Sequence, residues 1–154
     1  MLFLPSHLLP HTYHHSPPNN NVMALLTTLK IKDAQQDYKV ANFRMHMARS
    51  YNRFNPESAP MCEHIEITVV APNTDDYTFY EWFKNRSMLS GQLAYELPVS
   101  LNHTYSETRV IEFKDAQCYT FTESYDISDK NRRLLKIRII PEHVTMNSIE
   151  FDKL

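Results

Sequence analysis

Histidines supply the first candidate chemistry in this chain of 154 residues. His11, His14 and His15 stand in the spacing HxxHH, and imidazoles this close together can bind Zn²⁺ or Ni²⁺. A structural metal site, however, needs about four ligands on an ordered frame, with further groups that orient them. The surrounding segment offers neither, so the sequence predicts no metal site and no cofactor.

The triplet Cys62-Glu63-His64 offers a thiol close to an imidazole. On a strand, Cys62 and His64 would share a face about 7 Å apart, which is too far for a direct hydrogen bond. We therefore expect a buried cysteine and a surface histidine. Cys118 is the other cysteine, and no CxxC occurs, so a disulfide framework is not expected and a reducing compartment is the default.

Acidic and basic clusters complete the candidates. Four acids, Glu107, Glu112, Asp115 and Glu123, could form carboxylate pairs, but chance produces such pairs among 18 acids and no pocket is evident.

The basic run 130–138 (KNRRLLKIR) places Lys136 and Arg138 on one strand face and Leu135, Ile137 and Ile139 on the other. The formal charge of −2 argues against nucleic-acid binding, so this run predicts a solvated face beside an apolar core.

Glycine is scarce, and its scarcity excludes whole classes of enzyme. Gly91 is the only glycine in the chain. Phosphate-binding loops and dinucleotide-binding turns need several glycines, and the nucleophile elbow of hydrolases needs two. With no histidine in a recognisable catalytic context, the sequence predicts a protein that is not an enzyme.

The elements that position these residues begin after a distinct tail. Residues 1–22 hold four of the nine prolines and four of the eight histidines but no charged side chain. We expect a disordered or non-native tail there and a single domain over residues 23–154. No basic residue precedes the apolar start, which Pro5 and Pro10 interrupt, so no signal peptide is predicted. No run of about twenty apolar residues exists, so no membrane insertion is expected.

Period-two alternation dominates from Met23 onward, with a long polar loop at residues 50–60. A tight turn is expected at Lys114-Asp115. The pattern predicts a mostly β fold, a small closed β-barrel or sandwich of about seven or eight strands with one short helix. The expected strands are 24–31, 38–49, 62–71, 92–97, 108–114, 116–125, 134–142 and 144–151.

The one predicted helix spans about Thr74–Arg86. Asn73 or Thr74 is the expected cap, because either side-chain oxygen can accept a free backbone N–H. Gly91 is expected to mark the end of the helical segment. Phe79, Trp82 and Phe83 follow the i, i+3, i+4 spacing and predict an aromatic face that packs on the core.

The stretch 110–125 (VIEFKDAQCYTFTESY) carries a resemblance to a known family. It is similar to a pattern of the tube protein of type VI secretion systems (TssD/Hcp), closest to the branch found in Bacteroidota. The order of elements also matches over about residues 23–151, including an Arg-bearing loop with a proline and a helix with a central Trp. The family usually has more glycine, notably where this chain has Asn55-Pro56.

The resemblance implies a structural subunit that forms hexameric rings. The rings stack into a hollow tube that a contractile sheath expels with its spike, and the lumen can carry effector proteins. The expected location is the cytoplasm before firing and the exterior afterwards. For contacts between subunits we predict the loop, with the residues Arg49, Arg53, Phe54, Asn55 and Pro56.

Other functions remain open from the residues alone. One alternative is a monomeric β-barrel that binds a small apolar ligand in an interior lined by Met45, Met47 and aromatic side chains. A nucleic-acid binder using Lys130–Arg138 and an enzyme of unknown type are the weaker alternatives.

Overall fold

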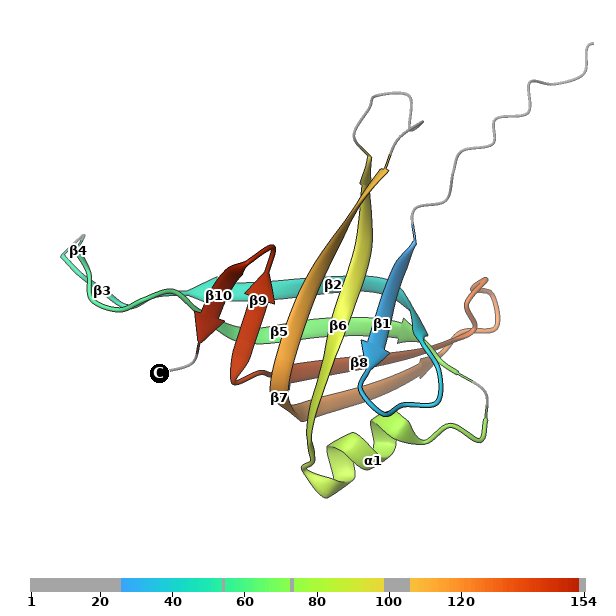
Figure 1. The fold of residues 1–154 in the computed structure, drawn as a ribbon. Helices are drawn as coiled ribbons and strands as arrows, with labels where there is room; N and C mark the ends of the chain where they lie inside the picture. Colours follow the sequence, from blue (N-terminus) through green and yellow to red (C-terminus); the bar gives the residue numbers. More distant parts are fainter. Residues whose placement is uncertain (1–25, 54, 73, 99–105, 153–154) are drawn as a thin grey trace, which may run out of the picture.

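A computed structural model describes residues 26–53, 55–72, 74–98 and 106–152. The predicted fold class is confirmed: the described residues are mostly β, with one short helix, and eight of their strands form one antiparallel sheet (Figure 1). The elements are β1 (Thr27–Ile31), β2 (Tyr38–Ala48), β3 (Tyr51–Asn52), β4 (Asn55–Pro56), β5 (Met61–Val70), α1 (Thr78–Asn85), β6 (Met88–Pro98), β7 (Ser106–Tyr125), β8 (Arg133–Ile140), β9 (His143–Met146) and β10 (Ile149–Asp152).

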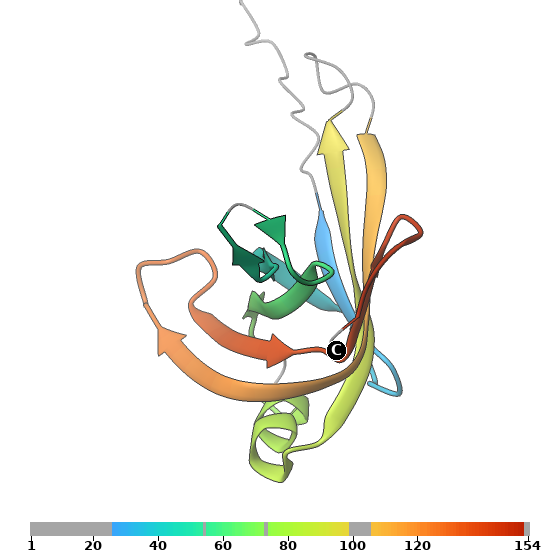
Figure 2. The same cartoon turned by 90° about the vertical axis from the view of Figure 1, so that its left-hand side faces the viewer.

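Six strands of the large sheet form a closed circuit of pairings. The antiparallel pairings run from β1 to β2, β5, β8, β7 and β6, and β6 pairs again with β1. β9 adds to the outside of this circuit along β7, and β10 pairs with β9. The curved strands β7 and β8 wrap one side of the resulting barrel (Figure 2). Closure leaves few sheet edges within the circuit itself.

One long strand joins the two sides of the barrel, where the sequence predicts two strands and a turn. The expected turn at Lys114-Asp115 is wrong, because β7 continues through it. Asp115 adopts φ 51°, and the strand bends there instead of reversing. β7 pairs with β6 from Ser106 through the bend to Gln117, and with β8 from Gln117 to Tyr125. The bend therefore lets one strand pair along two sides of the closed sheet, a common way to build a barrel corner.

Near the end of the chain, by contrast, one expected strand is two strands in the structure. The single strand expected at 144–151 is a hairpin of β9 and β10. Its two-residue turn is Asn147-Ser148, with φ of 48° and 70°. Positive φ at both positions matches the right-handed twist of the flanking strands.

The core lies between the two sides of the barrel. Ile65, Ile67 and Val69 on β5 are fully buried and alternate with residues that face outward, which is the period-two pattern of the sequence. Side chains from seven strands and the helix fill the rest of the interior. The large, fully buried members are Leu29, Tyr38, Phe79, Trp82, Leu93, Ile111, Phe113, Leu135, Ile137 and Ile139.

Helix α1 lies at one end of the barrel, at the bottom of both views (Figures 1 and 2). It begins at Thr78, so the expected start at Thr74 is wrong. Asn73 lies outside the described residues. The N-cap residue is Tyr77, whose side chain makes no capping hydrogen bond, and Asp76 before it accepts the Thr78 N–H through Oδ1 at 3.0 Å. The helix ends through Arg86, which adopts the left-handed conformation with φ 53°.

Gly91 does not end the helical segment as predicted, because it lies within strand β6. A Cβ atom there would stand 2.4 Å from the Lys30 carbonyl oxygen and 2.9 Å from Phe113 Cζ. The chain therefore needs glycine at this position for space, to let β1 and an aromatic ring approach β6 closely.

Candidate assembly surfaces

An arm of residues 49–60 projects from the barrel at the end of β2 (Figure 1). It contains the small two-stranded sheet of β3 and β4. Its base is closed by two hydrogen bonds, from the Glu57 N–H to the Ser50 carbonyl at 2.9 Å and from the Ser50 N–H to Ser58 Oγ at 3.0 Å. The arm therefore has its own backbone pairing.

The residues predicted for subunit contacts lie on this arm. Arg49, Arg53 and Asn55 are exposed, and Arg53 adopts φ 46° at the tip of the hairpin. Neither arginine makes a side-chain hydrogen bond or ion pair within the described part of the chain. Phe54 lies outside the described residues, and of Pro56 only the backbone, in β4, is described.

The predicted aromatic face of α1 divides into a buried part and an exposed part. Phe79 and Trp82 are buried, and the Trp82 indole N–H donates to the Ala116 carbonyl at 3.1 Å. Phe83 stacks on Phe121 with ring centroids 6.1 Å apart and remains 43% exposed. The helix is thus anchored by two aromatic residues, and the third leaves apolar surface available at the rim.

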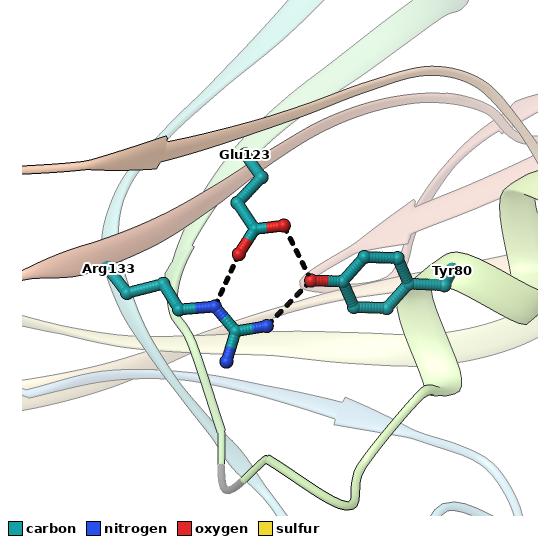
Figure 3. A network of polar contacts seen from close by, with 3 residues as sticks. All are labelled: Tyr80, Glu123 and Arg133. Atoms are coloured by element: carbon teal, nitrogen blue, oxygen red, sulfur yellow. Dashed lines mark hydrogen bonds and ion pairs between the residues drawn. The ribbon is translucent and has the colours of Figure 1, made fainter.

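A polar network fastens the helix to the corner formed by β7 and β8 (Figure 3). The Tyr80 hydroxyl donates to Glu123 Oε2 at 2.8 Å, and Arg133 Nη2 donates to the Tyr80 oxygen at 2.6 Å. Arg133 Nε also pairs with Glu123 Oε1. The hydrogen bonds from Tyr80 and Arg133 hold the pKa of Glu123 below its usual range.

Sequence reasoning missed this network, because its members stand 43 and 53 residues apart.

The basic run 130–138 is partly paired with neighbouring acids. Lys136 Nζ lies 3.0 Å from Glu66 Oε1, and Arg138 Nη2 lies 2.7 Å from Glu66 Oε2. Hydrogen bonds from Arg138 and then Lys136 lower the pKa of Glu66 to about 2. Such pairing offsets part of the positive charge that a phosphate backbone would need.

Apolar side chains and an open sheet edge lie at other parts of the surface. Tyr125 and Ile127 are exposed where β7 leads into the turn before β8. Ile149 is exposed on β10, which is the end strand of the large sheet. End strands and exposed apolar residues are surfaces on which another chain can add.

Both cysteine thiols are unreactive because they are buried. Cys62 and Cys118 are both free and buried, and burial raises the pKa of each thiol to about 11. Each thiol donates to the backbone carbonyl two residues ahead, His64 or Thr120. A register shift beside Glu63 puts Cys62 inward and His64 outward, so the expectation that they share a face is wrong.

The acids considered for catalysis do not form a candidate pair. Glu123 is held by Tyr80 and Arg133, and Asp115 occupies the bend of β7. Glu112 pairs across the sheet with Gln92 and Thr145, which carry no charge.

The described residues form a closed antiparallel β-barrel with a helix at one end and a projecting arm.

Comparison with known proteins identifies the family to which this barrel belongs. The family model described as "Hemolysin coregulated protein Hcp (TssD)" matches residues 23–154. The chain therefore belongs to the Hcp (TssD) family of type VI secretion tube proteins.

Solved structures share the fold. Hcp1 from Flavobacterium johnsoniae superposes with a TM-score of 0.67 at 23% identity, covering 83% of this chain and 99% of that one. Hcp1 from E. coli EAEC 042 gives 0.59 at 9% identity, covering 84% and 96%. Hcp3 from Pseudomonas aeruginosa gives 0.58 at 11%, covering 80% and 90%. No curated protein sequence matches the chain.

The family sets the general role: a component of the type VI secretion apparatus that is secreted and structural. Among the described residues, no helix is both long and apolar enough to span a membrane.

Proposed function

We propose that this protein is the structural subunit of an inner tube, forming hexameric rings that stack into a hollow cylinder. A contractile sheath expels the cylinder with its spike, and the lumen carries effector proteins. The subunit resides in the cytoplasm before firing and outside the cell afterwards. Family membership over residues 23–154 is the observation that carries this proposal.

The shape of the subunit supports assembly. A ring requires a heterologous interface, in which one patch of each copy binds a different patch of the next. The arm at residues 49–60 and the rim formed by α1 and the β7–β8 turn are two such different patches. We infer that the arm supplies one side of the contact, with Arg49, Arg53 and the neighbouring residues 54–56 as its contact residues.

The barrel domain of residues 23–154 performs this role as one unit in our proposal. The buried side chains of β1, β5, β6, β7 and β8 fill the interior. The alternative function, a monomeric barrel that holds a small apolar ligand, needs a wide internal cavity. Met45 and Met47, which would line it, pack against the core. The filled interior therefore favours the structural role.

Charge reversal on the arm tests the assignment. The Arg49→Glu/Arg53→Glu variant should lose ring formation on size-exclusion chromatography with light scattering, while circular dichroism shows an intact β fold. The control variant Lys30→Glu/Lys39→Glu changes the same charge at exposed positions on β1 and β2, outside both the arm and the rim, and should retain rings. Intact rings in the arm variant would remove the arm from the interface.

A further inference from the structure

Two histidines stand opposite each other on neighbouring strands. His46 on β2 and His64 on β5 are direct register partners. Their rings are parallel within 7°, with centroids 5.1 Å apart. Directly opposed residues of an antiparallel pair have Cβ atoms about 4.5–5.5 Å apart, which brings both imidazoles within reach of one ion.

A β-bulge adds a carboxylate to this pair. The register runs from His46 opposite His64 to Met47 opposite Cys62, so Glu63 is the extra residue on β5. Consecutive strand residues normally point to opposite faces, and a bulge relaxes this rule. Glu63 is exposed, its neighbour Cys62 is buried, and Glu63 Oε2 lies 2.9 Å from His46 Nδ1. Three potential ligands therefore gather on one outward face.

We propose that His46, Glu63 and His64 bind a divalent transition-metal ion, with Zn²⁺ as the best match. Each residue offers a ligand atom, and the three atoms lie within 4.8 Å of one another. Zn²⁺ takes imidazole nitrogen and carboxylate oxygen at about 2.0–2.2 Å, so tetrahedral ligands stand roughly 3.3 Å apart. The side chains of His46 and Glu63 are 64% and 47% exposed, which leaves them free to rotate over the remaining distance.

Three ligands on an exposed face leave the fourth position open to water or to a group from a second molecule, as in other three-ligand zinc sites. The Cys62 thiol does not contribute, because it points into the core. The site lies on the barrel itself, so this proposal does not depend on the formation of rings.

Zinc titration of the full-length protein tests the site, with the tail histidines removed from the background. His7, His11, His14 and His15 are replaced by Gln in every sample, because they could bind metal independently. We expect this background to bind one Zn²⁺ per chain in competition with a chromogenic chelator. Single His46→Gln, Glu63→Gln and His64→Gln changes should each weaken binding about ten-fold or more, since even outer groups of metal sites matter to that extent. Co²⁺ in place of Zn²⁺ should give visible absorption bands that the His46→Gln/His64→Gln variant loses.

The matched control is His143→Gln, which removes another exposed histidine of the barrel and should leave the affinity unchanged. Zn²⁺ should also raise the melting temperature of the background and not that of the His46→Gln/His64→Gln variant, because an ion that binds only the folded state stabilises it. The proposal is overturned if the background binds no Zn²⁺, or if His46→Gln/His64→Gln binds it as tightly as the background does.

Discussion

Replacement of Gly91 by alanine should destabilise the barrel more than any propensity scale suggests. The new Cβ would lie 2.4 Å from the Lys30 carbonyl oxygen, about 1 Å inside the 3.4 Å at which ordinary contact begins. Phe113 Cζ, at 2.9 Å, would be overlapped by a further 0.5 Å. The first clash is with backbone, so strand β1 itself has to move away from β6.

The expected cost follows from these overlaps. Overpacking of a close-packed core costs about 1–3 kcal/mol, and a clash with backbone belongs near the upper end of that range. Alanine restricts the unfolded chain more than glycine does, which offsets about 0.5–1 kcal/mol. We therefore expect Gly91→Ala to lower the free energy of unfolding by about 2–2.5 kcal/mol.

Urea unfolding, followed by the fluorescence of Trp82, measures this change. Trp82 is the only tryptophan, and it is buried against Phe113 at a ring distance of 6.4 Å. The urea midpoint should fall with an unchanged slope, at a fixed protein concentration. Gln92→Ala, at the next position on the same strand, should shift the free energy of unfolding by about 0.5 kcal/mol or less. A Gly91→Ala midpoint equal to or above that of the wild type would refute the steric reasoning.

Four further predictions concern other parts of the barrel. Trp82→Ala should cost about 3–5 kcal/mol in urea unfolding, because it empties a fully buried site; a loss below 1 kcal/mol would contradict the packing of α1. Arg86→Gly should raise the melting temperature by relieving about 0.5–1 kcal/mol of left-handed strain, and a lower melting temperature would contradict it. Cys62 and Cys118 should resist a thiol reagent at pH 8 and react in urea, since burial raises both pKa values to about 11; rapid labelling of the folded protein would contradict their burial. Glu66→Gln should cost about 1–2 kcal/mol at pH 7. The pKa of Glu66 falls from 4.5 to about 2 on folding, so this contribution is complete above pH 4.5 and is lost toward pH 2; a wild-type advantage that stays constant from pH 7 to pH 3 would contradict it.

Strands and fold class could be predicted from the sequence because alternation is a local signal. Ile65, Ile67 and Val69 alternate with residues such as Glu66 and Thr68, and these three are fully buried as the alternation predicts, although Thr68 is buried as well. The family resemblance rested on the stretch 110–125 and agrees with the family match.

The turns and bends could not be predicted in the same way. Glycine usually marks left-handed backbone, but here Asp33, Arg53, Arg86, Asp115, Asn147 and Ser148 adopt positive φ. These residue types also occur in ordinary turns and strands, so the bend in β7 and the turn before β10 leave only a weak trace in the sequence.

Contacts between residues that are distant in sequence could not be predicted from local sequence patterns either. The bulge at Glu63 reverses the expected relation of Cys62 and His64, and nothing in residues 62–64 themselves indicates it. The network of Tyr80, Glu123 and Arg133 joins three elements whose contact depends on the closed barrel. Such features follow from the pairing of strands that are distant in sequence.

The mass of the purified full-length protein, measured by light scattering over a wide concentration range and combined with negative-stain imaging, tests the central claim most directly. The tube account predicts a particle of six chains that appears as a ring with an open centre. A particle of one chain at every concentration, with no rings on the grid, would contradict it.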